Sequence, residues 1–191
     1  MNAAPPRRQL LAPDARRAGI IEATIPLLAE HGPAATSAQI ARAAGISQGT
    51  IFHVFADKQD LIDTAVRQVM DVEPLCAELI ALAGERSLSG RLASCADIVN
   101  RHLARAMPLL TKCGVPERED PKGHMLRKVR SAIADLLAPD AGSLTRPVDE
   151  LAGTFFFLCV AAVQQTVLGG TAMPDGHDVA TLFLDGARRR P

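Results

Sequence analysis

Two short helical segments joined by a glycine constrain the fold of this chain more than any other feature of its sequence. The segments span residues 36–44 and 47–55, and each is too short to be a stable helix alone. Thr36 and Gln39 have the spacing of a capping box, and Gly45 suits the left-handed position that follows a helix. Because the second segment also begins with a serine, a good N-cap, we expect two short helices that stabilise each other across a tight turn.

The second segment has one apolar and one polar face when it is drawn as a helix. Its Ile51 and Phe55 would face inward, so the opposite face carries small and polar side chains. The residues of that outer face are Gln48, Gly49, Thr50 and His53. Glutamine can pair with the edge of an adenine, threonine can contact a thymine methyl group, and histidine can donate or accept a hydrogen bond. A face of this kind can enter the major groove of DNA, and the glycine lets the backbone come close.

Contacts to the DNA backbone are expected beside this face. The unsatisfied amides and the hydroxyls of Thr36 and Ser37, at the start of the first helix, suit a phosphate. Lys58 can reach the same strand from the start of the next helix, and Arg42 is a further candidate. These residues would position the protein on DNA.

The rest of the sequence predicts an all-α protein. Ala and Leu carry the apolar content, the chain has no Trp and no Tyr, and strand-like alternation is rare. A first helix is expected to begin with Asp14 as its N-cap and to stop at Gly32, with Pro26 bending or splitting it. Long helices are expected at residues 58–71, 73–83, 89–107, 122–137, 147–168 and 178–189. The breaks between them include one at Pro108.

Nothing in the sequence points to an enzyme, a cofactor or a metal site. It contains no Gly-x-Ser-x-Gly, no His-Glu-x-x-His, no phosphate-binding loop and no dinucleotide-binding glycine pattern. The four cysteines form no Cys-x-x-Cys pair. The apolar run at residues 155–163 is shorter than the ~20 residues that a membrane-spanning helix needs. Since residues 1–13 are polar and proline-rich and resemble no secretory leader, we expect a cytoplasmic protein without a membrane partner.

Residues 16–62 resemble the DNA-binding domain of tetracycline-repressor (TetR) type regulators. The resemblance is sharpest over TSAQIARAAGISQGTIFHVFADKQDLI, with its Thr-Ser start, Ile-Ala, Ala-Gly-Ile-Ser, Gly-Thr-Ile-Phe, and trailing Lys and Leu. Two positions depart from the family's pattern. Phe52 stands where tyrosine is common, and Val54 stands where histidine is common. Contacts to DNA through these two positions should therefore be weaker or purely steric.

The resemblance implies a three-helix DNA-binding domain with a helix-turn-helix, followed by a larger helical domain for ligand binding and dimerisation. The corresponding division is a flexible arm at residues 1–13, the DNA-binding domain at 14–60 and the second domain at 61–191. A homodimer would bind a palindromic double-stranded DNA operator, usually to repress transcription, and a small-molecule effector would release it. The implied base or near-base contacts are Gln48, Thr50 and His53, and the implied backbone contacts are Thr36, Ser37, Phe52 and Lys58.

The second domain holds candidates for an effector pocket and a dimer interface. Apolar residues with a few polar anchors would line the pocket, and the candidates are Met70, His102, Leu103, Met107, His124, Met125, Phe156 and Gln164. Each of the apolar ones is also a plausible core residue. By analogy with the family, the last two helices form a four-helix dimer bundle through Leu151, Phe155, Leu158, Ala162, Val179, Leu182 and Phe183. The apolar stripe alone does not say whether its partner is another subunit or the same chain.

Two other hypotheses stay open at this point. Residues 1–58 carry six basic and four acidic residues, a modest net charge of +2. With the departures at Phe52 and Val54, this leaves room for a helical small-molecule or protein-binding module that has lost specific DNA binding. Cys113 lies next to Lys112 in a loop with glycine and proline, so a thiol sensor within a DNA-binding regulator is a further hypothesis.

Overall fold

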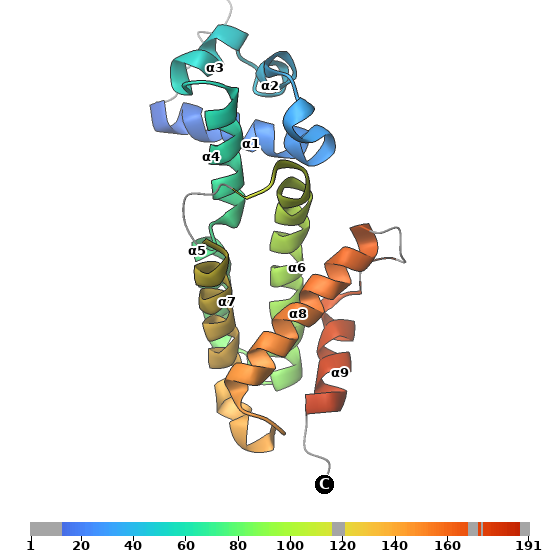
Figure 1. Ribbon diagram of the computed structural model, residues 1–191. Helices are drawn as coiled ribbons and strands as arrows, with labels where there is room; N and C mark the ends of the chain where they lie inside the picture. The colour runs from blue at the N-terminus through green and yellow to red at the C-terminus, as the bar shows by residue number, and fades with distance from the viewer. Residues whose placement is uncertain (1–12, 116–120, 168–171, 173, 188–191) are drawn as a thin grey trace, which may run out of the picture. The chain divides into compact units, whose positions relative to one another are not determined.

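A computed structural model describes residues 13–115, 121–167, 172 and 174–187, and every regular element in them is helical (Figure 1). The prediction of an all-α fold is confirmed. The helices are α1 Pro13–His31, α2 Ser37–Ala43, α3 Gln48–Val54, α4 Lys58–Met70, α5 Glu73–Ala81, α6 Leu88–Cys113, α7 Pro121–Leu137, α8 Val148–Val167 and α9 Gly176–Ala187. Short 3₁₀ turns lie at Gly32–Ala34, Leu82–Gly84 and Ala138–Ser143.

The chain divides into two compact units. The first contains residues 1–66 together with 109–115, and the second contains 67–108 and 116–191. Helices α4 and α6 therefore contribute residues to both units. The domain limits expected from the sequence, with an arm up to residue 13 and a boundary at residue 60, stay predictions. Residues 1–12 of that arm lie outside the described part of the chain.

The first unit packs α1, α2, α3 and the start of α4 around one apolar core. Its fully buried side chains include Leu28 of α1, Ile40 of α2, Ile51 and Phe55 at α3, and Leu61 of α4. α1 packs against α2, and α2 packs against α3. Since α2 and α3 have seven residues each, burial of one face per helix supplies most of their stability.

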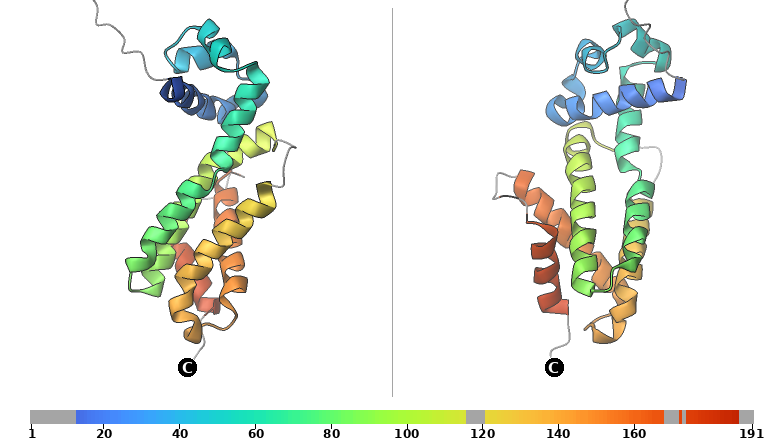
Figure 2. Two further views of the ribbon diagram at one scale, coloured as in Figure 1. Left: turned by 90° about the vertical axis from the view of Figure 1, so that its left-hand side faces the viewer. Right: turned by 180° about the vertical axis from the view of Figure 1, so that it is seen from behind.

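The second unit has a larger apolar core. α8 packs against α7 on one side and α9 on the other (Figure 2). Phe155 of α8 and Phe183 of α9 meet edge to face, with ring centroids 5.0 Å apart. Arg91, only 4% exposed, holds the end of α7 because its Nε donates to the carbonyl of Leu136 at 3.0 Å. The Arg91 guanidinium also forms an ion pair with Asp140.

Two prolines lie inside continuous helices. α6 continues through Pro108 to Cys113, so the predicted break there is wrong. α1 continues through Pro26 and is not split there, and the alternative that Pro26 bends it stays a prediction. A proline removes one backbone hydrogen bond, but packing on both sides of it can hold the helix together. Buried residues flank both prolines, among them Leu28 in α1 and Leu109 in α6. α1 also begins at Pro13, so Asp14 lies in the first helical turn rather than at the N-cap.

None of the helices in the described residues combines the length and the apolar content that crossing a bilayer requires.

Candidate nucleic-acid interface

A reciprocal capping box starts α2. The backbone N–H of Gln39 donates to Thr36 Oγ1 at 3.2 Å, and the N–H of Thr36 donates to Gln39 Oε1 at 2.7 Å. The predicted box is confirmed. The expectation of a free amide at Thr36 is wrong, because the Gln39 carboxamide already accepts from it. The Thr36 hydroxyl also donates to Gln39 Oε1 at 2.8 Å, so it is engaged within the box as well. A phosphate at this helix start is left with Ser37, which is half-buried.

The turn after α2 is a Schellman motif centred on Gly45. The N–H of Gly45 donates to the carbonyl of Arg42 at 3.2 Å, and the N–H of Ile46 donates to that of Ala41 at 3.0 Å. Gly45 has a φ of 65°, a conformation that side chains with a Cβ disfavour. The predicted turn glycine is confirmed. It ends α2 and directs the chain into α3, which begins three residues later at Gln48.

α3 presents a polar face outward while it is held from inside. Ile51 is buried in the core of the first unit, whereas Gln48, Gly49 and His53 are exposed. The N-cap Ser47 accepts from the N–H of Thr50 at 3.3 Å. The two hydroxyls also lie 2.8 Å apart, so the Thr50 side chain has a fixed direction. Phe52, on the flank of the helix, is 48% exposed.

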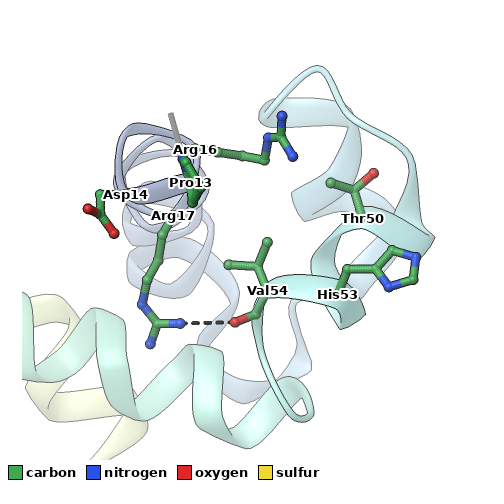
Figure 3. Close-up of a pocket in the computed structure, with 7 residues that line it drawn as sticks. All are labelled: Pro13, Asp14, Arg16, Arg17, Thr50, His53 and Val54. Carbon is green, nitrogen blue, oxygen red and sulfur yellow. Dashed lines mark hydrogen bonds between the residues drawn. The ribbon is translucent and has the colours of Figure 1, made fainter. Parts of the chain in front are cut away.

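Arg17 fixes the end of α3 to its neighbours. Its Nη1 donates to the carbonyl of Val54 at 3.0 Å (Figure 3). Its guanidinium lies 4.3 Å from the centre of the Phe55 ring. Nη2 lies 3.5 Å from the hydroxyl of Thr64 on α4. One arginine of α1 thus connects three helices. The Arg17 guanidinium is therefore engaged within the protein, although it is one of the six basic residues counted in the net charge of residues 1–58.

A hollow of about 550 Å³ opens beside α3, between it and the start of α1. The residues that line it are Pro13, Asp14, Arg16, Arg17, Thr50, His53 and Val54. Figure 3 shows Arg16 extending from α1 toward the side of the hollow that carries Thr50 and His53, while Asp14 points away on the other side of α1. Arg16 was not among the residues predicted to contact DNA. The sequence did contain a hint, because adjacent residues of a helix point in different directions and Arg16 and Arg17 therefore cannot both face the same neighbours.

Lys58 begins α4 and contacts the chain before α2. Its Nζ donates to the carbonyl of Pro33 at 2.7 Å. Asp57 caps the same helix, because its Oδ1 accepts from the N–H of Asp60 at 2.8 Å. An ammonium group has three donors, so Lys58 retains donors for a phosphate. Its role in DNA binding stays a prediction, as do those of the α3 residues.

The predicted effector residues of the second unit differ in their surroundings. Met70 and Phe156 are buried, Leu103, Met107 and Met125 are half-buried, and Gln164 is exposed. The side chain of His124 lies outside what the structure describes. His102 Nε2 lies 3.0 Å from Glu78 Oε1, and this hydrogen bond lowers the pKa of the carboxyl group. The structure does not test whether these residues hold an effector.

Four of the seven residues proposed for the dimer interface line one surface groove on α8 and α9. The groove has a volume of about 550 Å³, and its lining includes Leu151, Leu158, Leu182 and Phe183. Leu182 is 65% exposed, and Phe157 beside it is also exposed. The other predicted interface residues, Phe155, Ala162 and Val179, are buried in the core of the same unit.

The cysteines and potential metal ligands take no evident part in a site. Among the described residues, no three His, Cys, Asp or Glu side chains gather as a metal site would require. Burial raises the pKa of Cys95 and Cys159. Desolvation also raises the pKa of Cys113, and the nearby Lys112 lowers it by less. A raised pKa disfavours the reactive thiolate, so the structure gives no support to the thiol-sensor hypothesis.

Comparison with known sequences identifies relatives of the first unit. The profile of the bacterial regulatory proteins of the tetR family matches residues 20–65. The HTH-type transcriptional regulator BetI of Stenotrophomonas maltophilia is 40% identical over 72 residues, which are 37% of either chain. The match to this relative therefore spans little more than a third of its length.

Comparison with solved structures extends the likeness to nearly the whole chain. A TetR-family transcriptional regulator from Agrobacterium tumefaciens is 18% identical, with a TM-score of 0.69 over 93% of this chain and 100% of that one. SmeT in its complex with triclosan is 17% identical, with a TM-score of 0.63 over 92% of each chain. At these identities the likeness concerns the fold, and it includes the second unit as well as the helix-turn-helix.

Proposed function

This chain belongs to the TetR family of bacterial regulatory proteins, and on that basis we propose that its first unit binds a specific DNA sequence to regulate transcription. The observation that carries the proposal is the geometry of α3. Its Ile51, with Phe55 at its C-terminal end, is buried in the core, while Gln48, Gly49 and His53 remain exposed. A helix held in this way can enter the major groove without unfolding anything.

The hollow beside α3 supports a second set of contacts. Arg16 and His53 face it from opposite helices, and Thr50 lies between them. A phosphate of the DNA strand that borders the major groove fits the chemistry of these donors. Arg16, rather than the neighbouring Arg17, is therefore the basic residue at the start of α1 that would contact DNA.

We further propose that the protein acts as a dimer on an inverted repeat in the cytoplasm. The exposed Leu182 and Phe157 beside the α8–α9 groove are an apolar surface that a second copy would cover. Two copies related by a two-fold axis would place two α3 helices on half-sites one helical turn apart, or a multiple of it. In this proposal Leu182→Glu yields monomers by sedimentation and abolishes binding to the repeat.

Regulation by an effector completes the proposal. SmeT, a structural neighbour, has been solved with the small molecule triclosan, and the second unit has the same fold. We propose that this protein represses transcription until a small molecule, bound in the second unit, lowers its affinity for the operator. In vitro transcription from a promoter carrying the operator tests the sign of regulation, since activation by the protein would refute repression.

Selection of duplexes from a random DNA pool tests sequence-specific binding. The purified protein is compared with Thr50→Ala and Gln48→Ala, and with Gln165→Ala as a control because Gln165 is exposed on α8 in the second unit. We expect the wild type and the control to enrich one inverted repeat, and the two α3 variants to lose its preference at one or two base pairs. If the wild type enriches no sequence, the helical-module hypothesis replaces this proposal.

A further inference from the structure

One buried side chain in the second unit has no partner. Asn100 of α6 is 2% exposed, and neither its Oδ1 nor its Nδ2 forms a hydrogen bond. The other strongly polar group buried in this unit, the Arg91 guanidinium, is by contrast bonded to several carbonyls. Buried polar groups in folded proteins are nearly always paired, and an exception calls for a physical reason. Packing alone gives none, because leucine has nearly the same shape as asparagine and no polar atoms.

The neighbours of Asn100 on its own helix are mainly apolar. Ala96 lies one turn before it and Leu103 nearly one turn after it, on the same face of α6. Ala96, and Val99, which directly precedes Asn100, are fully buried and belong to the apolar core of this unit. The carboxamide is therefore an isolated polar group at the edge of an apolar core.

The charged residues on this part of α6 bind elsewhere. Asp97 Oδ1 accepts from the N–H of Gly176 at 2.7 Å. Arg101 and His102 both bind the carboxylate of Glu78. The charged groups on these two turns of α6 are thus already paired, and the core residues beside Asn100 are apolar. A neutral ligand fits these surroundings, because an unpaired charge in an apolar environment is strongly disfavoured.

We propose that Asn100 is the polar anchor for the effector, and that the effector is a neutral, largely apolar molecule carrying a cis-amide edge. A carboxamide offers one acceptor and one donor side by side, so a lactam or a primary amide satisfies both atoms at once. A ketone or an ether satisfies only the donor. The inference rests on the proposed function, because it names the ligand chemistry of the second unit. It also moves the anchor from His102, whose Nε2 is engaged by Glu78, to Asn100.

The position of Asn100 suits a regulatory ligand. α6 gives its residues up to Pro108 to the second unit and its last turn to the first unit. A ligand that binds Asn100 and favours one arrangement of α6 therefore acts on an element that both units share. Such a ligand changes DNA affinity only to the extent that it prefers one arrangement over the other.

Two matched probes test the chemistry on the full-length protein. The first is 2-piperidone, a six-membered lactam, and the second is N-methyl-2-piperidone, which keeps the acceptor and lacks the donor. Binding is followed by thermal shift and by the side-chain amide signals of the ¹⁵N-labelled protein. We expect the wild type to bind the lactam about two- to tenfold more tightly than its N-methyl form, the ratio that one neutral hydrogen bond supplies.

Two variants separate the anchor from the rest of the fold. Asn100→Leu should abolish the preference for the lactam and melt at or above the wild-type temperature, since it removes both unpaired atoms together. Gln165→Leu, an exposed change on α8, should keep the preference. If Asn100→Leu does not fold, the preference of the wild type and a shift of the Asn100 amide signals decide the question instead.

Three results would overturn the inference. The first is a wild type that binds both probes equally well. The second is an Asn100→Leu variant that keeps the preference for the lactam. The third is a large drop in the melting temperature of that variant, together with Asn100 side-chain amide signals that do not shift when the lactam is added to the wild type. The last result would mean that the carboxamide is satisfied by an internal water and serves the fold. Binding of the selected DNA duplex is measured in parallel. Asn100→Leu should still bind this duplex. Failure of the lactam test would therefore refute the role of Asn100 and leave the proposal of DNA binding standing. A wild type that binds no DNA would refute the proposal of DNA binding alone.

Discussion

Replacing Arg17 and Arg16 separately by alanine should produce opposite phenotypes, although the two residues are adjacent and chemically identical. Arg17 donates to the carbonyl of Val54 and lies over the Phe55 ring, so it holds the end of α3. Arg16 lines the hollow beside Thr50 and His53. The first substitution therefore acts on stability and the second on DNA binding.

The magnitudes follow from these contacts. A hydrogen bond from a charged donor contributes about 1.5–3 kcal/mol, and a cation–π contact near the surface about 0.5–1 kcal/mol. Because Arg17 is half-buried, water can replace part of its hydrogen bonding in the variant. We therefore expect Arg17→Ala to lower the free energy of unfolding by about 2 kcal/mol. In a chain of this length that lowers Tm by roughly 4–8 °C. Arg16 is half-buried too, but it makes none of the contacts to Val54, Thr64 and Phe55 that hold Arg17, so Arg16→Ala should stay within about 0.5 kcal/mol of the wild type.

Urea unfolding and a salt titration of operator binding measure the two effects. Losing one phosphate contact per subunit reduces the slope of log affinity against log salt by about 0.9 for each subunit, so Arg16→Ala should give a shallower slope with an unchanged urea midpoint. Arg17→Ala should shift the midpoint and leave the slope nearly unchanged. Equal losses of stability in both variants, or a stable Arg17→Ala, would refute the assignment.

Three further predictions concern backbone conformation, a buried charge and the thiols. Gly45→Ala should destabilise the first unit by about 1–2 kcal/mol in a thermal melt because φ is 65° there, whereas Gly49→Ala should fold normally and lose operator affinity in fluorescence anisotropy. Arg91→Met should lower the free energy of unfolding by about 3–5 kcal/mol, since it leaves buried carbonyls and a carboxylate without their donor; a variant as stable as the wild type in urea would contradict this. Burial raises the pKa of Cys159 to about 12 and also raises that of Cys95. Above pH 9.0 these thiols ionise in the unfolded chain but not in the folded one, so the free energy of unfolding should be highest below pH 9.0 and fall as the pH rises toward 12. A thiol reagent at pH 8 should label these two cysteines only after urea unfolds the protein.

Local signals in the sequence determine much of the first unit. Thr36, Gln39 and Ser47 act through hydrogen bonds to residues at most five positions away, and Gly45 acts through a positive φ that the lack of a Cβ permits. Such rules need no knowledge of the rest of the fold. The two short helices and the outward direction of the polar face of α3 could therefore be predicted.

The features that sequence reasoning missed depend on contacts between distant residues. Pro26 and Pro108 remain inside helices because buried neighbours hold the turns around them, and those neighbours are known only once the fold is. Arg17 contacts a carbonyl 37 residues away, so nothing local distinguishes it from Arg16. Asn100 looks like any polar residue of an amphipathic helix until its burial without a partner is seen.

The separation of a buried and an exposed face on α3 has a consequence for the evolution of such a regulator. The side chains that secure the helix, Ile51 and the Phe55 that follows it, face away from Gln48 and His53. We expect mutations on the outer face to leave the melting temperature nearly unchanged, so that their effect on DNA binding alone decides whether they persist. One scaffold can thus drift to new binding sites, or be retargeted in the laboratory, by exchanging a few exposed residues while the interior stays as it is.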